Sequence, residues 1–188
     1  ELIILSYSGS SGIEFPKQIE WYFNLLSEVG RMCTTASVYE GAENWPNLYA
    51  GAFSVMLLIL FVLNKRINWK KKIAPVLFVL LFMASFANKQ LDFIWHGLHF
   101  PDSLPGRQSY LYAFLVLTIG YATVRKWRGI RLWHIGVAVV FASALMAVST
   151  MFAGEDVTEY YAVIISILFV ALYGIMIVLL KLAARKNR

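Results

Sequence analysis

Five apolar blocks that contain no Asp, Glu, Lys or Arg run through the chain after residue 47. The last two hold the roughly 20 residues with which a helix crosses a hydrocarbon core about 30 Å thick. The second and third hold about 15 residues, which reach only about 23 Å as helices and therefore depend on their flanks. The blocks are residues 48–63, 73–87, 110–124, 132–153 and 161–180.

This pattern predicts an all-α integral membrane protein, a multipass helical bundle with five spans within residues 48–188. The composition agrees, because hydrophobic residues make up 59% and charged residues 15% of the chain, against roughly 45–50% and 25% in soluble domains. The single cysteine, Cys33, excludes an internal disulfide, so we expect a free thiol in ordinary packing.

The distribution of basic residues predicts how the spans are oriented. Of the 17 Lys and Arg residues, 13 fall in residues 64–72, residues 125–131 and the tail after residue 180. The other four share the remaining segments with all 11 Asp and Glu residues. By the positive-inside rule we expect a multipass membrane protein whose basic connections and C-terminus lie in the cytoplasm. The basic residues that give the chain its net charge of +6 then determine the orientation of the spans near anionic lipid headgroups. Nucleic acid is therefore not an expected partner.

The chain starts at Glu1 rather than Met, and residues 1–7 resemble the last turns of a hydrophobic segment. We therefore expect further sequence upstream. The Ser/Gly stretch Ser8–Gly12 is typical of a flexible connection, either native or introduced.

Residues 1–47 are expected to form an extracytoplasmic segment with an outward-facing amphipathic helix from Pro16 to Arg31. Pro16 can open a helix because its missing N–H is not needed there, and the apolar residues between Ile19 and Val29 make a broad surface. Such a helix lies on the outer membrane surface or covers a cavity, or it is one packed side of an extracellular domain. The expected polar side consists of Glu20, Asn24, Ser27 and Arg31.

Residues 88–109 connect the two short spans. This connection contains ionisable groups, but Trp95 and other large apolar side chains make it too apolar for a free loop. If its first part is helical, Asp92, His96 and His99 stand on one side at i, i+4 and i+7. The ends of this connection are expected below the headgroups, where non-helical backbone is tolerated only against protein or a wet cavity. We therefore predict a partly embedded outer loop that lines an outward-facing pocket.

The polar residues of this loop permit several uses. They can hold a sugar by hydrogen bonds, move a proton near neutral pH or bind a metal, and we expect no metal because their spacing matches no recognised ligand set. Alternatively, Asp92 orients one imidazole and the set packs the loop. Arg107 follows a Pro-Gly pair where the backbone can turn tightly, and its planar guanidinium suits a bidentate grip on a lipid-linked phosphate. An ion pair with Asp102 is the competing interpretation.

The same connection carries a motif of WHG, then FP, then P-x-R and a Ser before the next span. Its residues are Trp95, His96, Gly97, Phe100, Pro101, Pro105, Arg107 and Ser109. This motif closely resembles that of the YfhO family of bacterial membrane proteins. Residues 46–51 (PNLYAG) are similar to the start of a helix in that family, and residues 64–66 to its basic turn. The resemblance covers residues 44–122 and departs at Gly106, where the family usually has an aromatic residue, which counts against base or sugar stacking there.

The resemblance implies a GT-C-type glycosyltransferase that moves a sugar from a polyprenyl-phosphate donor to a cell-envelope polymer, such as lipoteichoic acid, on the outer face of the membrane. Enzymes of this type usually carry an acidic catalytic or metal-binding residue in a first outer loop, which lies outside this chain. We therefore expect a C-terminal fragment without the full catalytic set, without a cofactor of its own and inactive alone, with any divalent cation in the full-length protein. The expected partners are the lipid-linked sugar, the polymer acceptor and membrane lipid.

On this hypothesis Arg107 holds the donor phosphate, and the sugar or acceptor path is lined by Trp95, His96, His99 and Asp102. Two other classes of function are compatible with the sequence. A transporter or lipid flippase component would use the short spans as broken helices around a midplane site. Against this class, ion-coupled carriers usually need an ionisable group inside a span, and no Asp, Glu, Lys or Arg lies inside the five blocks. A non-catalytic envelope-assembly subunit would use the amphipathic helix as its contact surface.

Overall fold

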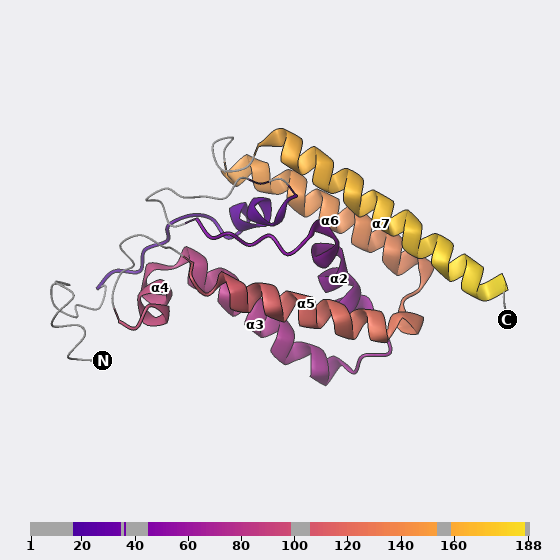
Figure 1. Cartoon of the computed structure of the whole chain (residues 1–188). Coiled ribbons are helices and arrows are strands. Elements are labelled where there is room, and N and C mark those ends of the chain that lie inside the picture. Colours follow the sequence, from indigo (N-terminus) through magenta and orange to yellow (C-terminus); the bar gives the residue numbers. More distant parts are fainter. Residues whose placement is uncertain (1–16, 35, 37–44, 99–105, 154–158, 187–188) are drawn as a thin grey trace.

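The computed structural model describes residues 17–34, 36, 45–98, 106–153 and 159–186 (Figure 1). In this part of the chain the regular structure is helical, with no strand beyond one isolated antiparallel bridge between Trp21 and Asn88. The all-α prediction is therefore confirmed. The elements in chain order are the 3-10 helix η1 (Ser27–Met32), α2 (Ala52–Leu63), α3 (Trp69–Ala87), α4 (Lys89–Trp95), α5 (Ser109–Arg125), the 3-10 helix η2 (Trp127–Gly129), α6 (Leu132–Ala153) and α7 (Tyr160–Lys186).

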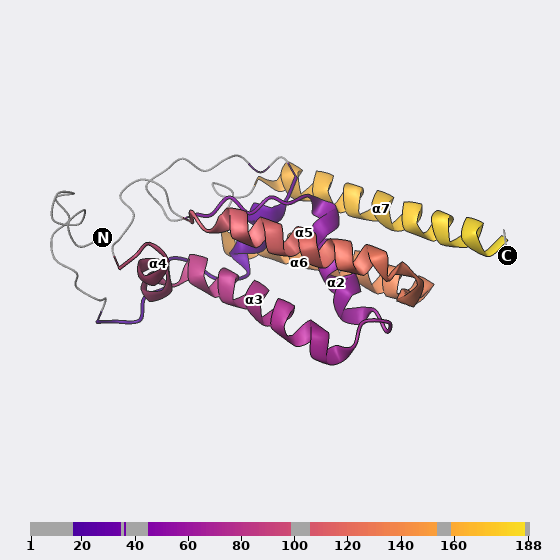
Figure 2. The same cartoon turned by 60° about the horizontal axis from the view of Figure 1, so that its bottom comes forward.

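The helices form an elongated bundle with two unlike ends. Figure 1 and Figure 2 both place the 64–68 connection, the 126–131 connection and the C-terminal end of α7 at one end, called the basic end below. Helix α4 lies at the opposite end, called the α4 end, together with the end of α6 and the start of α7. This arrangement agrees with the predicted grouping of the basic connections on one side of a membrane, and the side that they occupy stays a prediction.

Two helices in the described part, α6 and α7, are long and apolar enough to cross a membrane. Helix α6 coincides with the block 132–153, and α7 extends the block 161–180 at both ends. Helix α3 begins at Trp69, before its apolar block, because the Asn68 side chain accepts a hydrogen bond from the Lys70 N–H and starts the helix within the basic connection. Its 19 residues measure about 28 Å, so the residues that precede the apolar block supply the length that the block alone lacks.

Helix α2 is shorter than its apolar block, because its 12 residues measure only about 18 Å. The block begins at Leu48, but the helix starts at Ala52, directly after Gly51, whose φ of 90° is accessible mainly to glycine. Of the residues just before the helix, Leu48 is only 1% exposed, whereas Tyr49 is 54% exposed. The non-helical backbone before α2 is therefore covered only in part. Membrane crossing by α2, α3 and α5 stays a prediction.

Many of the buried residues of α6 and α7 are small, whereas many of their large apolar side chains are exposed. The contact between the two helices is close at Gly174, where an added Cβ would lie 2.5 Å from Val139 Cγ2. Outside the contact, large apolar side chains such as Val140 and Leu168 are 69% and 65% exposed. Small residues at helix contacts with apolar side chains outside are typical of helices that pack within lipid. The buried small residues include Ala138, Ala142, Ala162 and Ser166.

The predicted amphipathic helix from Pro16 to Arg31 is wrong. Pro16 lies outside the described residues, residues 17–26 form no helix, and only the 3-10 helix η1 follows. The reason is that backbone groups of the segment pair elsewhere: the Tyr22 N–H donates to the Ala87 carbonyl (2.8 Å), and the Lys89 N–H donates to the Glu20 carbonyl (3.1 Å). An α-helix would need these groups for its own ladder. Ser27 and Arg31, expected on a polar outer side, are 0% and 3% exposed.

Candidate functional site

Helix α4 places the first half of the WHG motif at the α4 end of the bundle. It starts because the Asn88 side chain accepts hydrogen bonds from the N–H groups of Gln90 and Leu91, both at 3.1 Å. It ends at Trp95, because Gly97 and Leu98 both have positive φ, 72° and 66°, which an α-helix cannot contain. The expected helical stretch through His99 therefore stops four residues short, and His99 itself lies outside the described residues.

Asp92 and His96 form a buried pair, as their i, i+4 spacing on one helix face predicts. His96 Nδ1 lies 3.1 Å from Asp92 Oδ1 and 2.9 Å from the Asp92 main-chain carbonyl, and the side chains are only 3% and 2% exposed. The hydrogen bond from the imidazole to this carboxylate raises the pKa of His96, while burial and the positive charge of Arg107 act in the opposite direction. The imidazole is thus oriented by Asp92 and lies within electrostatic reach of Arg107.

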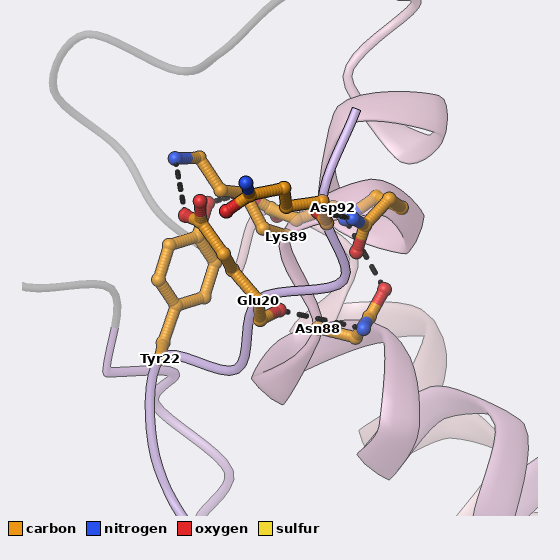
Figure 3. Close-up of polar contacts among 7 residues, drawn as sticks. Glu20, Tyr22, Asn88, Lys89 and Asp92 are labelled. Atoms are coloured by element: carbon orange, nitrogen blue, oxygen red, sulfur yellow. Dashed lines mark hydrogen bonds and ion pairs between the residues drawn. The ribbon is translucent and has the colours of Figure 1, made fainter. Parts of the chain in front are cut away.

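Residues 20–22, called the front segment below, complete the candidate site from the side opposite α4, and the sequence did not indicate this contact. Tyr22 donates a hydrogen bond from its hydroxyl to Asp92 Oδ2 (3.4 Å), across 70 positions of the chain. Burial, followed by the charge of Asp92, raises the pKa of Tyr22, so the phenol stays protonated and donates. Lys89 Nζ lies 2.7 Å from Glu20 Oε2, and Asn88 also contacts the Glu20 carbonyl at 3.4 Å (Figure 3). Residues 20–22 are therefore fastened along the start of α4.

Two of the predicted substrate-binding residues are accessible. Trp95 is 41% exposed, and its ring stacks on Phe82 of α3 with centroids 5.3 Å apart. Arg107 is exposed just before α5, and among the described residues no carboxylate lies within ion-pair distance of it. Asp102, its suggested ion-pair partner, lies outside the described residues, as does His99. His96 differs from Trp95 and Arg107 because it is only 7% exposed.

The structure explains why a glycine stands at position 106, where the family motif usually has an aromatic residue. The φ of Gly106 is 64°, and an added Cβ would lie 2.9 Å from the Cβ of Pro46. An aromatic side chain at this position would therefore need both a strained backbone and a displaced Pro46. In the described part of the chain, no three His, Cys, Asp or Glu side chains gather as metal ligands.

A second buried carboxyl, Glu28, lies in η1 and was missed by the sequence analysis. It is 0% exposed, and neither carboxyl oxygen has a hydrogen-bond partner among the described residues. Burial raises the pKa of Glu28 to about 9, so the group is neutral at pH 7. Nearby, Arg31 donates to the Pro46 carbonyl (3.2 Å) and to Asn47 Oδ1 (2.7 Å). A Glu three residues before an Arg suggests an exposed ion pair, so the spacing gave no signal of burial.

Comparison with known proteins identifies the family. Residues 5–188 match the family described as "Bacterial membrane protein YfhO", so this chain belongs to the YfhO family. The predicted resemblance is confirmed, and it extends over almost the whole chain rather than residues 44–122 alone. No curated protein and no solved structure shows a significant match.

Proposed function

We propose that this chain forms part of a polytopic membrane glycosyltransferase that transfers a sugar from a polyprenyl-phosphate donor to a cell-envelope polymer such as lipoteichoic acid. Membership of the YfhO family supports the membrane setting. The observation that carries the proposal is an exposed Arg107 within electrostatic reach of the buried Asp92–His96 pair, together with an exposed Trp95 at the end of α4.

Arg107 is the proposed contact for the donor phosphate. A guanidinium with no carboxylate partner in the described part can offer two parallel N–H donors to a phosphate. In the transfer, an acceptor hydroxyl attacks the anomeric carbon, the bond from that carbon to the phosphate oxygen breaks, and the hydroxyl proton leaves. A cation at the phosphate stabilises the negative charge that builds up on the leaving group.

Trp95 is the proposed sugar platform, because a half-exposed indole presents an apolar face against which a sugar ring packs. His96 is buried, so we assign it a positioning role: the Asp92–His96 pair holds the turn that follows α4. His99 and Asp102 complete the proposed sugar or acceptor path. The proposal assigns no acid or base catalyst among these residues.

The experiment is a transfer assay on membranes that contain the full-length protein, with radiolabelled polyprenyl-phosphate sugars and envelope polymer. Arg107→Ala should lower kcat/KM for the donor by roughly 10- to 100-fold, the value expected for a lost hydrogen bond to a charged group. Arg107→Lys should recover only part of this loss because Lys is not bidentate. Lys17→Ala is the matched control, since Lys17 is also exposed and cationic but not part of the site.

Equal transfer by wild type, Arg107→Ala and Lys17→Ala would refute the role of Arg107. Absence of transfer with every donor, from protein that is shown to be folded and inserted, would refute the enzyme. Uptake or lipid flipping by the same protein would then support the transporter, and a stable partner that survives purification would support the assembly subunit.

A further inference from the structure

A cleft of about 470 Å³ opens at the basic end between α2, α3 and α5, far along the bundle from the site at α4. Its floor is apolar and includes Phe61, Leu115 and Ile119. Its rim is cationic, and all four rim cations are exposed. They are Arg66, Lys71, Arg125 and Lys126.

The cleft exists because α3 and α5 are joined at one end only. Near α4, Tyr112 of α5 meets Phe82 and Phe86 of α3 edge to face, with ring centroids 6.4 Å and 6.0 Å apart. Toward the basic end, both views show α3 diverging from α5 (Figures 1 and 2). Pro75 lies in this part of α3, where its missing N–H leaves the Lys71 carbonyl without its helical donor and weakens the ladder.

The charge on the rim is not neutralised by the chain. The sequence contains no Asp or Glu between Glu43 and Asp92, or between Asp102 and Glu155. In the described residues the two ion pairs are Lys89–Glu20 and His96–Asp92, both at the α4 end. An anion from outside the chain is therefore the natural partner of the rim.

The apolar floor selects among anions. The lining residues of α5 from Leu115 to Arg125 follow one face of that helix, over a length of about 15 Å. This length accommodates a phosphate at the rim and the first part of an acyl chain along the floor. A soluble anion would leave the floor in contact with water, and a zwitterionic lipid would add a positive charge beside the rim.

We propose that this cleft binds an anionic glycerophospholipid of the surrounding leaflet, with its phosphate between the rim cations and one acyl chain between α3 and α5. Basic pockets between helices at a membrane surface bind anionic headgroups in this manner. The inference does not depend on glycosyl transfer, because it concerns the opposite end of the bundle. It requires only that the chain is folded in a membrane.

The test is titration of the purified full chain with phosphatidylglycerol, with bound lipid counted by native mass spectrometry. Parallel titrations use phosphatidylcholine, polyprenyl phosphate and inorganic phosphate. The double variant Lys71→Gln with Arg125→Gln should weaken phosphatidylglycerol binding by about tenfold or more, since each cation contributes to attraction of an anionic lipid. The control double variant Arg128→Gln with Lys186→Gln removes the same charge from exposed positions outside the cleft and should change binding less than about twofold.

A second variant, Ala122→Phe, fills the cleft without a change of charge and should also abolish the tight site. Val140→Phe is its control, because Val140 is 69% exposed on α6. A photoreactive phosphatidylglycerol should label peptides from α3 and α5 of the wild type, which tests the site even if a variant does not fold. Equal binding of phosphatidylcholine, preference for polyprenyl phosphate, binding of inorganic phosphate alone, or equal effects of the test and control variants would each overturn the proposal.

Discussion

Glu28 provides a prediction in which the structure fixes both sign and size. Its carboxyl is buried without a hydrogen-bond partner in the described part of the chain, and burial raises its pKa from 4.5 to about 9. η1 lies outside the five predicted spans, so the unfolded segment exposes this group to water. Between these two pKa values the folded protein holds a proton that the unfolded chain has lost. Stability therefore decreases as pH rises from about 4.5 to about 9.

The size follows from the same two values. Each unit of pKa difference corresponds to about 1.4 kcal/mol, so at pH 7 the protonation of Glu28 costs folding about 3 kcal/mol. Glu28→Gln keeps the shape of the neutral acid and removes this cost. The variant should melt roughly 6 to 12 °C above wild type at pH 7, from 2 to 4 °C per kcal/mol in a chain of this size. At pH 5 the advantage should shrink to below about 1 kcal/mol.

The assay is thermal unfolding of the full chain in detergent at pH values from 5 to 8, followed by circular dichroism. Glu159→Gln is the matched control, because Glu159 is exposed, and it should unfold with the same pH dependence as wild type. Infrared absorption of a protonated carboxyl that is present in wild type at pH 7 and absent in Glu28→Gln would confirm the neutral state directly. If wild type and Glu28→Gln show the same pH dependence, the carboxyl is ionised or solvated and the reasoning fails.

Three further predictions concern other parts of the molecule. Asp92→Asn should lower the pKa of His96, because it removes the negative charge and leaves only a neutral, weaker acceptor for the imidazolium, and NMR titration of the labelled histidine measures the shift in either direction. Gly174→Leu should destabilise the protein by about 1–3 kcal/mol through overpacking, whereas Gly136→Ala, whose added Cβ meets nothing within 4 Å, should be neutral in the same unfolding assay. Cys33, whose pKa burial raises to about 11, should react with a maleimide in folded protein at pH 7 at least tenfold more slowly than after denaturation, and equal rates would contradict its burial.

The helices could be predicted from sequence because each depends on a contiguous feature. Apolar blocks without charge leave the backbone no alternative to helix in lipid, and this constraint acts within one segment. For α6 the bounds of the apolar block are also the bounds of the helix in the structure. The ends of α3 and α2 differ from the blocks because they depend on single residues, a capping Asn68 and a Gly51 with positive φ, which a hydropathy pattern does not detect.

Part of the candidate site was also accessible to sequence reasoning. Asp92 and His96 stand one helical turn apart, so the pair forms as soon as α4 does. The motif that contains Trp95 and Arg107 identified the family without the structure. The break after Trp95 was not foreseen, because Leu98 adopts a positive φ that its side chain disfavours.

The contacts of the front segment could not be predicted, and they determine how the site is built. Periodicity in residues 17–31 favoured a helix, but the backbone groups of Glu20 and Tyr22 pair with residues 87–89 instead. These pairs join positions 65 and 69 residues apart, and no local pattern encodes such a partner. Among the described residues, the Tyr22 hydroxyl donates to Asp92 Oδ2, and His96 Nδ1 lies 3.1 Å from Asp92 Oδ1. Because a buried polar group is stable only when it is hydrogen-bonded, the front segment is part of the candidate site and not only a cover for it.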